Sequence, residues 1–155
     1  MTHPTRRDVL VLLVLCGIAG LGAGATTRAQ GSPGQLLREY PVPAGSHVHD
    51  VAPARDGGIW YTAQVVGELG WLDPATGKTR QITLGEGSAP HGVIVGPDGA
   101  PWITDGGLNA IVRVSPSTQE IRRYPLPATH RRADLNTETF DHQGDLWFTG
   151  QAGMY

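Results

Sequence analysis

A repeat of 42 to 45 residues is the feature that most constrains the fold of this 155-residue chain. It is marked by Trp60, Trp102 and Trp147, and other positions recur in step with them. Each tryptophan has a glycine three residues before it, a threonine two residues after it, and a polar residue eleven residues before it. The matching sets are Gly57, Gly99 and Gly144; Thr62, Thr104 and Thr149; and His49, His91 and Asn136. A period of this length that is built from strands is typical of the blades of a propeller.

Each repeat predicts four short antiparallel strands. In the second repeat we expect strands over residues 93–95, 101–104, 110–114 and 120–124, with a turn at Pro97-Asp98-Gly99. The third repeat contains only its first two strands before the sequence stops. We therefore predict an all-β chain, with about three blades of a β-propeller in residues 30–155 and an incomplete C-terminus.

Composition narrows the range of functions. The formal net charge is -2, so the chain has no basic surface to attract a phosphate backbone, and we expect no nucleic-acid partner. The only cysteine, Cys16, lies in the first 29 residues. The rest of the chain therefore has no disulfide or thiolate chemistry.

Residues 1–29 have the pattern of a signal peptide. Arg6-Arg7 precedes the apolar run 9–18, and small residues follow. The paired arginines favour the twin-arginine export route. We expect cleavage after Ala29, with Ala25 as the second choice and an uncleaved anchor as the alternative. The mature protein is then periplasmic or secreted, and it has no membrane partner.

Two columns of residues are expected to meet at one end of the propeller, near its central channel. The first column is His49, His91 and Asn136, and the second, four residues after each tryptophan, is Gln64, Gly106 and Gln151. We predict a small-molecule or peptide ligand in the channel of a monomer. Its predicted contacts are His49, Asn136, Gln64 and Gln151, with His91 as the candidate catalytic residue. The alternative is that the two histidines bond only to a neighbouring blade.

Four phrases of the sequence carry a resemblance to a known family. They are Ala89-Pro90-His91-Gly92-Val93, Gly96-Pro97-Asp98-Gly99, Arg123-Tyr124-Pro125-Leu126-Pro127 and Leu146-Trp147-Phe148-Thr149. From about Leu37 to Gln151 the chain resembles the virginiamycin B lyase (streptogramin B lyase) family. The resemblance implies a seven-bladed propeller. It also implies a carbon–oxygen lyase that opens the lactone of a cyclic depsipeptide with the help of a divalent metal, Mg²⁺.

The resemblance also implies where a metal site would lie. The family takes its carboxylate ligands from two residues before the first column and from four residues after a tryptophan. Here those places hold His47, Ala89 and Asp134, and Gln64, Gly106 and Gln151. We therefore expect the metal ligands to lie outside this sequence. Two other functions stay open, a non-catalytic propeller that binds a ligand or a protein, and a metal-dependent hydrolase of the gluconolactonase type.

The leader generates a first prediction. Fused to a folded reporter, residues 1–34 should carry it to the periplasm by the twin-arginine route, and changing Arg6→Lys and Arg7→Lys together should abolish that transport. Cell fractionation of the two fusions measures this. Continued export of the double-lysine fusion by the general secretion route would show that the twin-arginine assignment is wrong.

Overall fold

The structure is a computed structural model that describes residues 37–129 and 132–152. It contains three antiparallel sheets and no helix in these residues. The first blade is formed by β1 (Val48–Pro53), β2 (Ile59–Ala63), β3 (Glu68–Leu72) and β4 (Thr79–Thr83). The second is formed by β5 (Pro90–Val95), β6 (Pro101–Asp105), β7 (Ala110–Val114) and β8 (Ile121–Pro125). The third has β9 (Leu135–Phe140) and β10 (Leu146–Gly150). The predicted all-β propeller blades are confirmed.

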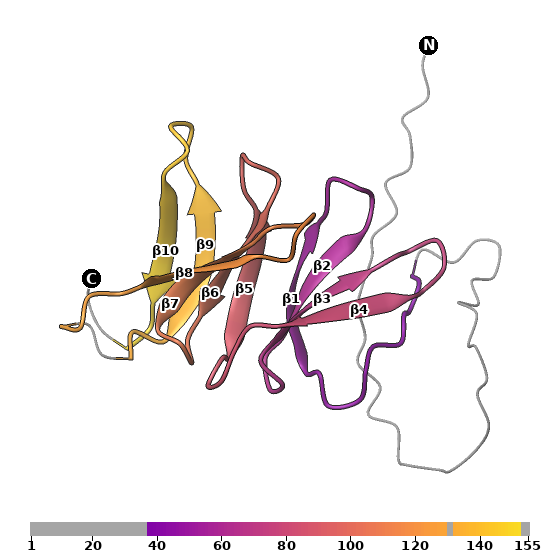
Figure 1. Ribbon diagram of the computed structural model, residues 1–155, viewed down its shortest axis with the longest axis horizontal. Helices are drawn as coiled ribbons and strands as arrows, with labels where there is room; N and C mark the ends of the chain where they lie inside the picture. Colours follow the sequence, from indigo (N-terminus) through magenta and orange to yellow (C-terminus); the bar gives the residue numbers. More distant parts are fainter. Residues whose placement is uncertain (1–36, 130–131, 153–155) are drawn as a thin grey trace.

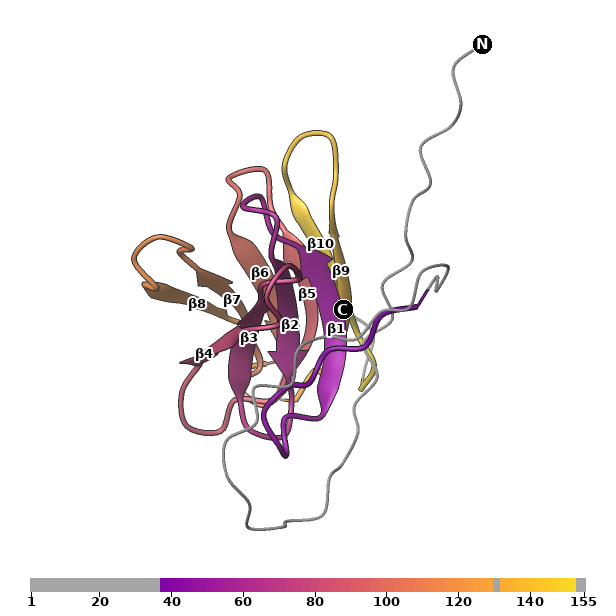
Figure 2. The same ribbon diagram turned by 90° about the vertical axis from the view of Figure 1, so that its right-hand side faces the viewer.

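The sheets stand one after another, as blades do (Figure 1). Within each four-stranded sheet the spatial order of strands is the order of the sequence. Among the first strands of the three sheets, β5 contacts both β1 and β9, and Figure 2 shows the three strands close together. The described segments include no helix with the length and apolarity of a membrane span. The signal peptide expected in residues 1–29 lies outside the described residues.

The core lies between the blades, and the three repeated tryptophans follow this plan. Trp60 is 2 % exposed in a cluster that joins the first blade to Val93 and Ile103 of the second. Trp102 lies 5.6 Å, centroid to centroid, from the ring of Phe140 in the third blade. Trp147, in the last described blade, is 64 % exposed. Trp60 and Trp102 therefore pack toward the next blade. Trp147 is exposed because the described residues include no blade after its own.

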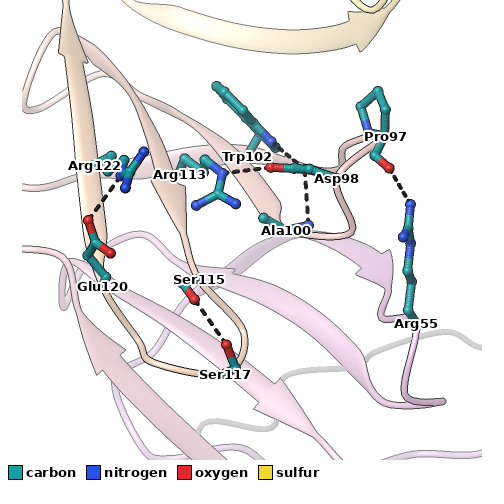
Figure 3. Close-up of polar contacts among 10 residues, drawn as sticks. All are labelled: Arg55, Pro97, Asp98, Ala100, Trp102, Arg113, Ser115, Ser117, Glu120 and Arg122. Atoms are coloured by element: carbon teal, nitrogen blue, oxygen red, sulfur yellow. Dashed lines mark hydrogen bonds and ion pairs between the residues drawn. The ribbon is translucent and has the colours of Figure 1, made fainter.

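The turn after the inner strand of the second blade is held by a carboxylate (Figure 3). Asp98 accepts hydrogen bonds from the Trp102 indole at 3.1 Å and from Arg113 Nε at 2.7 Å. Arg55, from the equivalent turn of the first blade, donates to the Pro97 carbonyl at 2.5 Å. These turns have structural roles, and they lie at the end of the inner strands opposite to the two histidines.

A β-bulge recurs at one place in every blade. Between matched strand pairs, two residues of the inner strand face one threonine of the second strand. These sets are His49 and Asp50 against Thr62, His91 and Gly92 against Thr104, and Asn136 and Thr137 against Thr149. A bulge leaves a backbone group unpaired and redirects a side chain. The threonine satisfies that group, because its hydroxyl accepts the N–H of the second bulge residue at 2.9 to 3.1 Å.

The same hydroxyl joins neighbouring blades. Thr62 donates to the backbone carbonyl of His91 at 2.8 Å, and Thr104 donates to the carbonyl of Asn136. Thr149, which has no later blade among the described residues, donates within its own blade to Thr137 at 3.4 Å. Thr62 and Thr104 are fully buried, so their bonds are shielded from water.

These bonds generate a prediction for stability. Thr104→Val should destabilise the full chain by about 1–3 kcal/mol, because it leaves the Gly92 N–H and the Asn136 carbonyl buried without their partner. Thr149→Val is the matched control, and since Thr149 is exposed it should cost less than about 0.5 kcal/mol. Urea unfolding measures both. Equal losses in the two variants would contradict the proposed link between blades.

Candidate functional site

The bulges bring the first column of residues together. The imidazole rings of His49 and His91 have their centroids 3.6 Å apart and are tilted by 44°. The side chain of Asn136 continues the line, with its Nδ2 3.2 Å from His91 Nε2. We call these three residues the imidazole–amide ridge. One residue from each of the three blades contributes to it, as the repeat predicts.

The backbone beneath the ridge is fixed from both sides. The carbonyl groups of His91 and Asn136 each accept the threonine hydroxyl of the preceding blade. Asp50, next to His49, accepts the backbone N–H of Val93 at 3.0 Å through Oδ2. His91 thus contacts the neighbouring blades both through its backbone carbonyl and through its ring, which lies 3.2 Å from Asn136 Nδ2.

The ridge differs in exposure along its length, which affects its protonation. His49 is exposed, whereas His91 and Asn136 are half-buried. Burial lowers the pKa of His91 below its ordinary value of 6.5, and the neighbouring imidazole of His49 lowers it further. Asp134 and Asp50 act in the opposite direction. The balance leaves His91 neutral at neutral pH.

The second column lies at the same end of the blades, where its backbone is bonded to the segments that precede the ridge. The backbone N–H groups of Gln64, Gly106 and Gln151 donate to backbone carbonyl groups two residues before the ridge positions, those of His47, Ala89 and Asp134. Among the described residues, neither glutamine side chain bonds to a ridge residue. The structure therefore places Gln64 and Gln151 beside the ridge without bringing their side chains onto it.

Asp105 holds two loops together at this end. Its Oδ2 accepts the Ser88 hydroxyl at 2.6 Å, and its Oδ1 accepts the backbone N–H groups of Ala89 and Leu108, both at 2.9 Å. It is fully buried. This carboxylate fixes the backbone just before His91.

Sequence reasoning missed Glu138, a buried carboxyl group behind the ridge. It lies two residues after Asn136 and is 7 % exposed, and its Oε2 is 3.0 Å from the Thr104 hydroxyl. A signal was present in the repeat. Glu138 stands nine residues before its tryptophan, where the other repeats have Val51 and Val93.

The residues present do not fit the divalent metal that the family resemblance implies. In residues 37–129 and 132–152 no three His, Cys, Asp or Glu side chains are grouped so that they could hold a metal ion. The positions four residues after the tryptophans carry amides or glycine. The ridge itself offers two imidazoles and an amide, which suit hydrogen bonding to a neutral ligand.

Comparison with known proteins agrees with this architecture. The model of the virginiamycin B lyase family matches residues 23–154. No curated protein matches the chain. A solved streptogramin B lyase structure is 28 % identical with a TM-score of 0.65, over 72 % of this chain and 37 % of that one. Selenomethionine-substituted virginiamycin B lyase from Staphylococcus aureus is 26 % identical, with the same coverage and TM-score.

A third solved structure contains a ligand. It is a catalytically inactive His-to-Ala variant of virginiamycin B lyase from Staphylococcus aureus with quinupristin. It is 27 % identical to this chain, with a TM-score of 0.64, over 70 % of this chain and 36 % of that one. The chain thus spans a little over one third of the length of these solved structures.

The electrostatics of the ridge generate a prediction. In an NMR pH titration the imidazole of His91 should titrate below pH 6.5. His49→Gln should raise that pKa because it removes a neighbouring positive charge, and Asp134→Asn should lower it because it removes a negative one. Since the folded pKa lies below the ordinary value, the contribution of His91 to stability is present above pH 6.5 and is lost as the pH falls through the folded pKa. Shifts of the same sign in both variants would contradict this account.

Proposed function

The chain belongs to the virginiamycin B lyase family, and from that premise we propose that its blades provide ligand-binding surface for a carbon–oxygen lyase that opens the lactone of a cyclic depsipeptide. The observation that carries the proposal is the imidazole–amide ridge, in which three blades each present one polar side chain at the same end. The ligand class is suggested by quinupristin, which accompanies the inactive family member described above.

The chemistry of the ridge suits such a ligand. A neutral imidazole has one N–H donor and one bare nitrogen acceptor, and an amide has both kinds of group. A cyclic depsipeptide offers ester and amide carbonyl groups and amide N–H groups in a fixed ring. His49, His91 and Asn136 would therefore bind and orient the ring, with Gln64 and Gln151 beside them as further candidate contacts.

His91 is the candidate for proton transfer. In the proposed elimination a base takes a proton from the carbon next to a carbonyl group. A carbon–carbon double bond forms, and the lactone C–O bond breaks with its electrons on the departing oxygen. A histidine that is neutral at neutral pH can accept that proton, and the lowered pKa of His91 keeps it in this form. His49 would assist by keeping His91 unprotonated.

We propose further that the mature protein works outside the cytoplasm. The support is the sequence pattern of residues 1–29, which lie outside the described residues. The protein would then bind a depsipeptide before that compound enters the cytoplasm.

The proposal predicts a clear separation of stability from binding. With quinupristin as the probe, calorimetry on the full chain should show binding at least about tenfold weaker for His91→Ala and for Asn136→Ala. The urea midpoint of His91→Ala should stay close to that of the unchanged protein. His142→Ala, an exposed histidine in the turn between β9 and β10, is the matched control and should change neither value.

Different results lead to different conclusions. Binding of quinupristin without opening of its lactone would favour a non-catalytic binding propeller. Unchanged binding in both ridge variants would contradict the proposed site. A large loss of stability in His91→Ala with normal binding by the folded fraction would make His91 a structural residue.

A further inference from the structure

The two seams between blades carry their carboxyl groups on opposite sides. At the first seam, between the first and second blades, Asp50 of the first blade accepts the N–H of Val93 in the second. At the second seam, the position equivalent to Asp50 is Gly92, and the position equivalent to Val93 is Glu138. A carboxyl group thus stands at each seam, but it comes from the earlier blade at the first and from the later blade at the second.

Gly92 makes the room that Glu138 fills. A Cβ atom added to Gly92 would collide with Oε2 of Glu138 and would stand 2.7 Å from the Asn136 carbonyl oxygen. The carboxyl group therefore lies against the backbone of β5, directly after His91. If residue 92 had a side chain, the carboxyl group of Glu138 could not occupy this place.

The hydrogen-bonding capacity of Thr104 bears on the state of this carboxyl group. A threonine hydroxyl has one proton to donate and two lone pairs that accept. The hydroxyl accepts the Gly92 N–H, and two oxygens lie within reach of its single proton, the Asn136 carbonyl and Glu138 Oε2 at 3.0 Å. One proton cannot fully serve two acceptors. If Glu138 is protonated it can donate to a lone pair of Thr104 instead, which leaves the threonine proton for the Asn136 carbonyl.

We propose that Glu138 is a positioning residue for the imidazole–amide ridge and that it acts in its protonated form, holding the Thr104 hydroxyl so that its proton points to Asn136. The function of this residue rests on the proposed role of the ridge. Ionisation would remove the donor from Thr104 and place a negative charge beside two acceptors. The seam beneath Asn136 and His91 would loosen as a result.

The surroundings support a protonated Glu138. The pKa of this carboxyl group is raised to about 8: burial is the largest cause, the hydrogen bond with Thr104 acts in the opposite direction, and the negative charge of Asp50 on β1 adds to the rise. Its second oxygen, Oε1, is buried and has no hydrogen-bond partner, a position that disfavours a carboxylate.

Among the described residues, Asp50 on β1 is the charged group that acts on Glu138. On β5 the carboxyl group lies against Gly92, the residue after His91. On β10 the residue paired with Glu138 is Phe148, which carries no charge. Asp105 has both oxygens engaged by Ser88, Ala89 and Leu108, so it gives no bond to Glu138.

The experiment compares the unchanged full chain with Glu138→Gln, which keeps a donor for Thr104 but cannot ionise. The unchanged protein holds a proton on Glu138 up to a pH of about 8, whereas the unfolded chain releases it near 4.5. Its unfolding equilibrium constant should therefore rise by up to about tenfold per pH unit between these values. Glu138→Gln should lack this added slope, and Asp134→Asn, an exposed carboxylate nearby, should retain it.

A second measurement separates positioning from a purely structural role. The NMR signals of the His91 ring should shift again near pH 8, well above the imidazole's own titration, and this shift should disappear in Glu138→Gln. A ¹³C titration of the Glu138 carboxyl near 4.5 would overturn the protonated state. A carboxyl that titrates near 8 without any response from His91 would overturn the positioning role. Neither readout uses a depsipeptide, so failure of quinupristin binding would count against the proposed function alone.

Discussion

A buried threonine hydroxyl is the contact on which the arrangement of the blades depends. It satisfies the backbone N–H that a bulge leaves unpaired, and it donates to a carbonyl of the next blade. Both partners are backbone groups, so the same contact occurs at the two seams, and at the second seam the carboxyl group of Glu138 also reaches the threonine. The apolar clusters between blades supply most of the buried area, but this bond sets where the inner strands stand relative to one another.

The ridge is a consequence of that bond. A bulge turns His49, His91 and Asn136 out of the regular alternation of their strands, and the threonine holds the carbonyl groups of His91 and Asn136. The side chains therefore start from matched backbone positions in successive blades. Contact between the rings and the amide follows from this spacing. Burial lowers the pKa of His91, and the neighbouring imidazole of His49 adds to the effect.

The repeat was sufficient to predict the blades and the meeting of His49, His91 and Asn136 at one end, because both depend on residues that recur at fixed intervals. It could not predict which side chains would touch. The backbone of Gln64 and Gln151 lies beside the ridge, but their side chains make no bond to it. Glu138 was missed because it departs from the repeat, in which the two earlier blades have valine at the equivalent position.

The third position of the ridge shows what this construction allows over evolutionary time. Asn136 stands where the two earlier repeats have histidine, and yet its carbonyl accepts the same threonine hydroxyl as that of His91. The bond to the threonine uses only the backbone at this position, so it does not depend on which side chain the residue carries. A duplicated blade can in this way change the polar group that it presents by a single substitution, while the bond that joins it to its neighbour is inherited unchanged.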